Sequence, residues 1–179
     1  MKLRFAETDD DVAGIQEIYA DIVERTAISF ESAVPGHLEI ARRVAEVMPT
    51  YPWLVAADDA RVLGYAYGHR FGERAAYAWS VETSIYVRDN ARGQGVGTKL
   101  YAALFALLAA QGYQQALAGI TLPNDASVGL HESVGFERAA TYRAVGFKFG
   151  EWRDVGWWQR GLQATPDPAP PTPVGVDAL

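Results

Sequence analysis

Residues 92–97 read Arg-Gly-Gln-Gly-Val-Gly and connect a β-rich segment to the strongest helical pattern in the chain. Glycines let backbone N–H groups turn toward a ligand because no Cβ atom stands in the way. The following helix adds unpaired N-terminal N–H groups and the positive end of its dipole. This stretch therefore predicts a cradle for a pyrophosphate, to which the Arg92 guanidinium adds a charge-assisted contact. The residues expected to form the cradle are Arg92, Gly93, Gln94, Gly95, Val96, Gly97 and Thr98.

Two familiar phosphate-binding motifs do not match this spacing. A P-loop has a lysine followed by Ser or Thr after its last glycine, whereas here Thr98 precedes Lys99. The dinucleotide fingerprint has a further glycine and belongs to an opening β-α-β unit, whereas this loop lies in mid-chain. A glycine-rich turn that merely caps a helix is the structural alternative.

The pattern on either side of the loop predicts one mixed α/β domain over residues 1–162. Hairpins at both ends with helices between them favour a mixed, mostly antiparallel sheet over a doubly wound parallel one. The expected strands span 2–6, 53–57, 62–69, 77–87, 115–122, 137–149 and 152–160. The expected helices span 12–23, 36–48, the glycine loop to a C-cap at Gly112, and 126–133. Five prolines within 166–173 predict an extended or disordered tail over 163–179.

Composition excludes several classes of site and partner. The formal net charge of -6 argues against nucleic acid or an anionic membrane as a partner. The chain has no cysteine, so disulfides and thiolate nucleophiles are excluded, and its three histidines lack the spacing of a metal site. No signal region or membrane span is evident, so a cytoplasmic protein without a metal is expected.

A carboxylate inside an apolar strand is the best candidate for a general base. Glu82 lies in the run Trp79 to Val87, which is otherwise rich in β-branched and aromatic residues. Burial would raise the pKa of this carboxyl and make it a better base than a solvated one. The alternative is a carboxylate on the exposed face of the strand.

The motif Arg92-x-x-Gly95-x-Gly97, following Ile85-Tyr86-Val87, resembles the acetyl-CoA signature of the GNAT acetyltransferases. Their second motif resembles Asn124-x-x-Ser127 with the following Leu130-His131. Further segments are similar to the phosphinothricin N-acetyltransferase subfamily, among them Ala76-Tyr77-x-Trp79, Leu122-Pro123-Asn124-Asp125 and Val145-Gly146-Phe147-Lys148. The resemblance covers nearly the whole chain.

This resemblance implies an acetyl-CoA-dependent N-acetyltransferase that acts on the α-amine of a small amino-acid-like substrate such as phosphinothricin, methionine sulfoximine or the sulfone. It implies a sheet splayed near its middle, with the pantetheine arm of acetyl-CoA in the gap, and a homodimer. The oxyanion donor is expected to be a backbone N–H at the end of 85–87. Beyond the glycine loop, the cofactor contacts that it implies are Ile85, Tyr86, Val87, Asn124 and Ser127.

The resemblance also suggests roles for individual residues. Glu82 matches the family's general base, and His131 stands where many members have a tyrosine acid. An equally weighted alternative is that His131 hydrogen-bonds the cofactor or the core and transfers no proton. Phe30, Arg74, Tyr77 and Ser84 match positions of the substrate pocket. Gly72 stands where some herbicide-specialised members have a basic residue, which favours a generalist or a sulfoximine/sulfone acetylator.

Two other functions compete with this interpretation. A GNAT enzyme acting on another amine would fit much of the pattern, and the acidic net charge suits a polyamine. A carboxylated substrate suits Arg74 better. A non-catalytic acetyl-CoA-binding module would keep the glycine loop but would not need Glu82 in its apolar strand.

Overall fold

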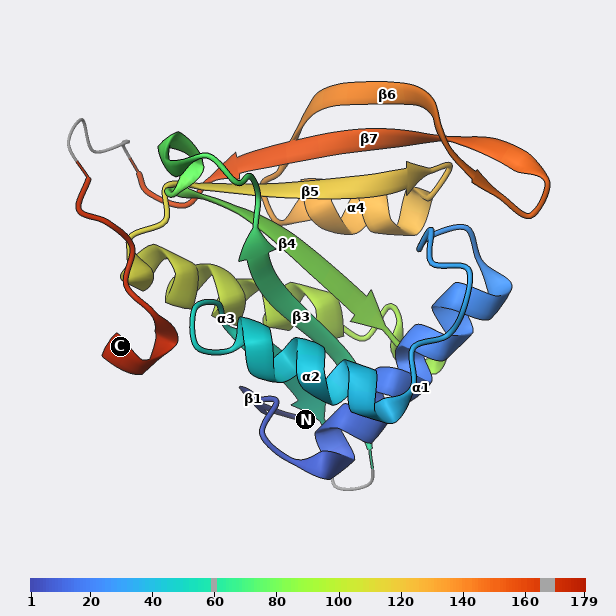
Figure 1. The fold of residues 1–179 in the computed structure, drawn as a ribbon, viewed down its shortest axis with the longest axis horizontal. Helices are drawn as coiled ribbons and strands as arrows, with labels where there is room; N and C mark the ends of the chain where they lie inside the picture. The colour runs from blue at the N-terminus through green and yellow to red at the C-terminus, as the bar shows by residue number, and fades with distance from the viewer. Residues whose placement is uncertain (59–60, 165–169) are drawn as a thin grey trace.

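The computed structural model describes residues 1–58, 61–164 and 170–179, which form the α/β arrangement shown in Figure 1. The strands are β1 (Lys2–Phe5), β2 (Trp53–Ala57), β3 (Val62–Arg70), β4 (Ser80–Val87), β5 (Gln115–Leu122), β6 (Glu137–Lys148) and β7 (Glu151–Gly161). The α-helices are α1 (Asp9–Arg25), α2 (His37–Val47), α3 (Val96–Gln111) and α4 (Asp125–Ser133). Among these residues, none of the helices combines the length and the apolar character needed to cross a bilayer.

The described strands form one mixed sheet in the order β1-β2-β3-β4-β5-β7-β6. All neighbouring pairs are antiparallel except β4 and β5, which run parallel. The mostly antiparallel sheet expected from the hairpin pattern is therefore confirmed. The parallel pair arises because β4 is connected to β5 through α3, a crossover that returns the chain in the same direction.

Helices cover both faces of the sheet, and each face has its own apolar core. On one face, Ile15 and Ile18 of α1 pack with Ile40 and Val44 of α2 over Val55 of β2. On the other face, the stripe of α3 packs against the central strands, with the members Leu100, Leu104, Leu108, Val81 and Ala116. In Figure 1, α1 and α2 lie on the near side of β3 and β4, and α3 lies behind them.

The ends of the helices follow local capping chemistry. Thr8 caps α1: its hydroxyl accepts the Asp11 N–H, and the Asp11 carboxylate accepts the Thr8 N–H in return. Gly95 and Gly112 flank α3 at φ 76° and φ 102°, left-handed values that disfavour other residues. The prediction that Gly112 ends this helix is confirmed.

The start of the fourth strand differs from the expectation of 77–87. A short 3-10 turn, η1, occupies Ala75–Tyr77, and β4 begins at Ser80. The Trp79 carbonyl accepts the N–H groups of Gln114 and Gln115, so the chain is already held at the entrance of β5 there. Aromatic residues at 77 and 79 fit strand propensity, but these contacts decide their conformation.

The C-terminal segment also differs from the sequence-based prediction. Of the tail predicted over 163–179, residues 165–169 fall outside the described residues. Residues 170–179 pack on the domain: the Pro171 carbonyl accepts the Trp79 Nε1–H at 2.8 Å. Val174 exchanges backbone and side-chain hydrogen bonds with Gln111, and the Val176 N–H donates to the Pro49 carbonyl. Proline-rich composition predicted extended backbone but could not predict these partners.

Candidate active site

The centre of the sheet opens where β4 and β5 separate. In the described part of the chain these strands pair only from Ser80 to Glu82, opposite Gln115 to Leu117. Antiparallel pairing with β3 continues along β4, and the Arg88 N–H donates to the Leu63 carbonyl. Since hydrogen-bonding direction alternates along a strand, this bond directs the N–H groups of Ile85 and Val87 away from β3 and toward the opening.

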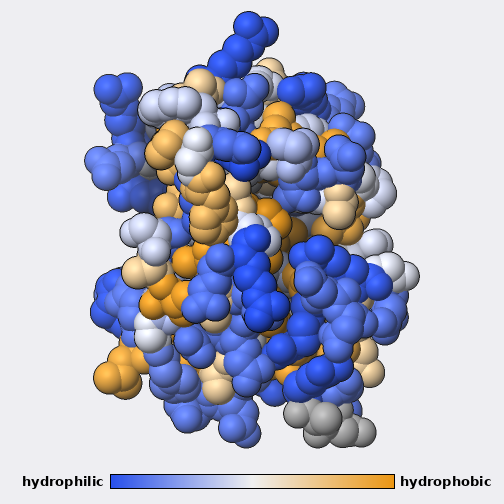
Figure 2. Space-filling view, turned by 90° about the vertical axis from the view of Figure 1, so that its right-hand side faces the viewer, coloured by the Kyte–Doolittle hydropathy of each residue, from blue (hydrophilic) through white to orange (hydrophobic). Residues whose placement is uncertain are grey.

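A cleft of about 450 Å³ lies at this opening and brings most of the predicted cofactor residues together. Every residue predicted for cofactor binding lines it except Gln94, whose exposed side chain donates to the Asn90 carbonyl. The lining residues from that prediction are Ile85, Tyr86, Val87, Arg92, Gly93, Gly95, Val96, Gly97, Thr98, Asn124 and Ser127. Figure 2 shows this end of the molecule, with hydrophobic surface at the bottom of a hollow between polar side chains.

The three glycines of the loop are needed for two different reasons, backbone conformation and helix packing. Gly93 and Gly95 adopt φ 72° and φ 76°, and a Cβ at either would meet open space. They therefore serve the left-handed backbone of the loop and leave room for a ligand. A Cβ at Gly97 would lie 2.7 Å from Leu130 Cδ2, so this glycine lets α3 approach α4 closely. The loop and the first turn of α3 suit the pyrophosphate of acetyl-CoA.

The far side of the opening is closed by the loop between α1 and α2. The Thr121 hydroxyl of β5 donates to the Ile28 carbonyl at 3.1 Å. The Lys148 ammonium of β6 donates to the carbonyls of Val23 and Ser29, both at 2.7 Å. These bonds tie the loop to the second half of the sheet, across the space into which β4 and β5 diverge.

Glu82 lies at the last β4–β5 pair, where the separation begins. Its cross-strand partner on β3 is His69, and Tyr67 is the partner of Ser84, so all four side chains share one face of the sheet. The Glu82 side chain is 25% exposed. Burial raises the pKa of Glu82 to about 7 from its ordinary 4.5. This carboxyl can therefore both accept and release a proton near neutral pH.

From the sequence, His69 is expected to be a surface or loop residue, whereas the structure places it in β3 with a half-buried side chain. Its Nε2 atom lies 3.8 Å from Glu82 Oε1, and its side chain is 31% exposed. Burial lowers the pKa of His69, which favours the neutral imidazole. Its partner depends on the register of the β3–β4 pair, which the sequence alone does not give.

His131 is buried and both its ring nitrogens have partners. It is 3% exposed, and Nδ1 lies 2.7 Å from the Ser127 carbonyl, which can only accept. The proton must then be on Nδ1, so Nε2 accepts the Tyr101 hydroxyl at 2.7 Å. Burial lowers the pKa of His131. The ring does not line the cleft, which Ser127 and Leu130 of the same helix reach instead.

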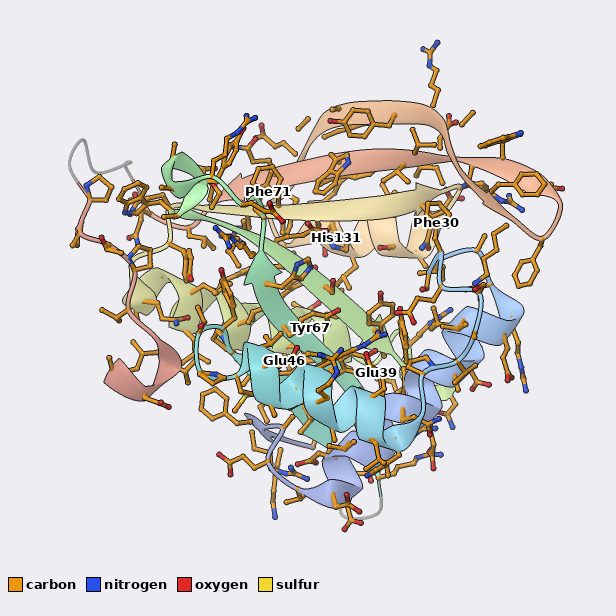
Figure 3. All side chains as sticks on the ribbon, in the orientation of Figure 1. Phe30, Glu39, Glu46, Tyr67, Phe71 and His131 are labelled. Atoms are coloured by element: carbon orange, nitrogen blue, oxygen red, sulfur yellow. The ribbon has the colours of Figure 1, made fainter. Side chains whose placement is uncertain are left out.

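The four predicted substrate residues do not converge on one pocket. Ser84 shares the Glu82 face of β4, and Phe30 packs over the Gly146 position of β6. Arg74 and Tyr77 line a separate hollow of about 210 Å³ beside the C-terminal segment. In Figure 3, Phe30 projects from the α1–α2 loop, while Tyr67 and Phe71 come from β3 and the loop that follows it.

Phe71 packs between Tyr77 of the second hollow and Trp157 of β7, a contact that the sequence did not reveal. Its ring makes edge contacts with Tyr77 and Trp157, at centroid distances of 5.5 and 6.0 Å. Gly72 packs under the same tyrosine, because a Cβ there would lie 2.7 Å from Tyr77 Cδ2.

In the described residues, no group of three or more acidic or histidine side chains could hold a metal ion.

Comparison with known proteins agrees with this geometry. Residues 4–157 match a family model described as an acetyltransferase (GNAT) domain. A phosphinothricin N-acetyltransferase of Streptomyces viridochromogenes is 38% identical over 167 residues, which cover 93% of this chain and 90% of the relative. A methionine sulfoximine/methionine sulfone acetyltransferase of Pseudomonas aeruginosa is 40% identical over 161 residues, covering 87% of this chain and 91% of the relative.

A solved structure shows the same arrangement with its ligand. The crystal structure of a GNAT superfamily phosphinothricin acetyltransferase from Sinorhizobium meliloti, in complex with acetyl-CoA, superposes with a TM-score of 0.90 at 35% identity. The match covers 97% of this chain and 94% of that one. The open sheet, the glycine loop at α3 and these matches lead to one conclusion: the chain belongs to the GNAT acetyltransferases and is an acetyl-CoA-dependent N-acetyltransferase.

Proposed function

We propose that this enzyme acetylates the α-amine of a small amino-acid analogue of the phosphinothricin, methionine sulfoximine or methionine sulfone type. The relatives named for these substrates support the substrate class. The observation that carries the proposal is the place of Glu82, a half-buried carboxyl at the point where β4 and β5 separate. A non-catalytic acetyl-CoA-binding module would have no use for a carboxyl of raised pKa at that point.

In this proposal the amine attacks the thioester directly and Glu82 is the general base. Glu82 accepts a proton from the ammonium, directly or through water, and the nitrogen then forms its bond to the carbonyl carbon. The N–H groups of Ile85 and Val87, which point toward the opening, are suited to stabilise the charge that develops on the carbonyl oxygen. The C–S bond then breaks and the sulfur leaves as the thiolate. The nitrogen gives up its second proton to the thiolate or to water, so no protein acid is obligatory.

For His131 we propose a positioning role. Its two ring nitrogens are engaged by Ser127 and Tyr101, and the ring lies behind the wall of the cleft. A proton on Nδ1 that is held by a backbone carbonyl is not presented to a leaving sulfur. The ring instead connects α3 with α4, and therefore fixes the two helices whose N-terminal regions line the cleft.

A homodimer is the proposed assembly. The hairpin of β6 and β7 exposes large apolar side chains, and β6 is the edge strand of the sheet. The exposed apolar residues on this hairpin are Tyr142, Val145, Phe147, Phe149 and Trp152. Light scattering on a sizing column tests the proposal: a dimer that Trp152→Asp converts to a monomer supports it, and a monomeric parent protein contradicts it.

A thiol-release assay tests the substrate class. The panel contains phosphinothricin, methionine sulfoximine, methionine sulfone, common amino acids and spermidine, each at saturating acetyl-CoA. We expect turnover of the sulfoximine, the sulfone or phosphinothricin, and little turnover of spermidine, because the relatives are named for amino-acid analogues. The reverse ranking contradicts the proposal and favours a polyamine acetyltransferase.

A further inference from the structure

We propose that His69 is the proton partner of Glu82: its imidazole takes over the proton that Glu82 removes from the substrate amine and passes it to water. The inference rests on the proposed role of Glu82 as base. It adds a second catalytic side chain, which comes from the neighbouring strand.

The pairing of β3 with β4 fixes the two side chains in this relation. His69 and Glu82 are directly opposite each other in the register, so their side chains leave the sheet on the same face. Nε2 and Oε1 are 3.8 Å apart. This distance exceeds a hydrogen bond by about 1 Å, so the proposed transfer requires a side-chain rotation that brings the two atoms together.

The other ionisable groups around this pair are either neutral or paired elsewhere. Tyr67, also on β3, has its ring centroid 5.6 Å from that of His69, and burial raises its pKa, so it stays a neutral phenol. Arg43 of α2 faces this region but is bound to Glu31 and Glu39. Glu31 also accepts the Tyr19 hydroxyl at 2.8 Å. These cation and anion charges are thus already paired.

Proton transfer balances without any additional reactant. The ammonium N–H bond breaks as the Glu82 O–H bond forms, and that O–H bond then breaks as an N–H bond forms at His69 Nε2. The imidazolium releases its proton to water, because the His69 side chain is about one third exposed. Because burial raises the pKa of Glu82 and lowers that of His69, the imidazolium is the stronger acid and holds the proton only briefly before passing it to water. This release leaves Glu82 as a carboxylate, ready for the next turnover.

Replacement of His69 by alanine, followed by addition of imidazole, is the decisive experiment. We expect kcat at pH 7 to fall about tenfold or more, within the range for a proton-transfer group, while the KM for acetyl-CoA stays unchanged. Added imidazole should restore kcat in a saturable manner, and more at pH 8 than at pH 6, because the free base is the acceptor. His37→Ala is the matched control, since His37 is an exposed histidine bound to Asp9.

His69→Gln distinguishes proton transfer from packing, because it fills the site and hydrogen-bonds but does not take up the proton. The inference is supported if kcat also falls in His69→Gln and added imidazole does not restore it, because the glutamine side chain fills the site. Near-normal kcat in His69→Gln, or an alanine variant that imidazole does not restore, overturns it. Glu82→Gln, measured alongside, separates the two proposals. If that variant is impaired while His69→Ala is normal, the base stands and the inference fails; if Glu82→Gln is normal, the proposed base itself fails.

Discussion

Glu82→Gln is the most direct perturbation of the site, because it keeps the shape of the side chain and removes its ability to accept a proton. Burial holds the pKa of Glu82 at about 7. The carboxylate fraction is then about one tenth at pH 6, one half at pH 7 and nine tenths at pH 8. In the parent enzyme, kcat should follow these fractions along its acid limb if chemistry is rate-limiting.

The glutamine variant should lose a factor of about 10² to 10⁴ in kcat at pH 7, the range for removal of a positioned general base. Its affinity for acetyl-CoA should hardly change, because Glu82 does not line the cleft. The residual rate should keep rising with pH, since more amine arrives deprotonated and needs no base. Stopped-flow thiol release between pH 6 and 9, with calorimetry for acetyl-CoA, measures both quantities.

Glu82→Gln should also change the free energy of unfolding, in a direction that follows from the raised pKa of Glu82. A carboxyl whose pKa is about 7 in the folded protein and 4.5 otherwise binds its proton more tightly when folded. The parent therefore loses stability as pH rises from 4.5 through 7, by about 1 to 3 kcal/mol for a side chain with a quarter of its surface exposed. Glu82→Gln should melt higher than the parent at pH 8 and nearly equally at pH 4. Near-normal kcat at pH 7, or an unchanged melting difference between the two pH values, would refute the reasoning.

Three further perturbations follow from the structure. Gly95→Asp forces a carboxylate and a left-handed backbone into the anion cradle, so acetyl-CoA affinity should fall at least 100-fold by calorimetry, about 3 kcal/mol; Gly36→Ala, at an open position, is the control. His131→Asn removes the buried bond to α3 and should cost about 1 to 3 kcal/mol of unfolding free energy with little change in kcat; a large loss of kcat in a stable variant would restore the acid role. Deletion of 165–179 should lower the melting temperature by several degrees, because the contacts to Trp79 are lost; an unchanged melting temperature would mean that the docked segment contributes no stability.

The parts of the site that depend on local chemistry could be predicted from the sequence. The glycine loop is one such part, because left-handed residues before a helix leave a direct mark as Gly93 and Gly95. Glu82 is another, since a carboxylate in an apolar strand is conspicuous. The apolar neighbours of Glu82 in the strand do not explain its burial, however. Val81 and Ile85 pack toward α3, whereas Glu82 lies on the opposite face, toward α1 and α2, together with Tyr67.

The parts that depend on register and distant contacts could not be predicted. His69 reads as an unremarkable histidine until the β3–β4 register places it opposite Glu82. The partner that defines His131 is Tyr101, thirty positions away on another helix. The same holds for Arg74, whose type suggests a substrate contact but whose position beside the C-terminal segment follows from how a loop packs.

The short seam between β4 and β5 makes ligand binding part of the stability of the sheet. Only three residue pairs join the two strands in the described chain, so the amides of Ile85 and Val87 face an opening instead of a neighbouring strand. We propose that a bound pantetheine chain occupies that opening in the manner of a partial strand. Backbone hydrogen exchange at these two amides should therefore slow sharply when acetyl-CoA is added. Binding should also raise the unfolding free energy by about 2.7 kcal/mol at a free ligand concentration of 100 Kd, so cellular acetyl-CoA would protect the half-open sheet from local unfolding.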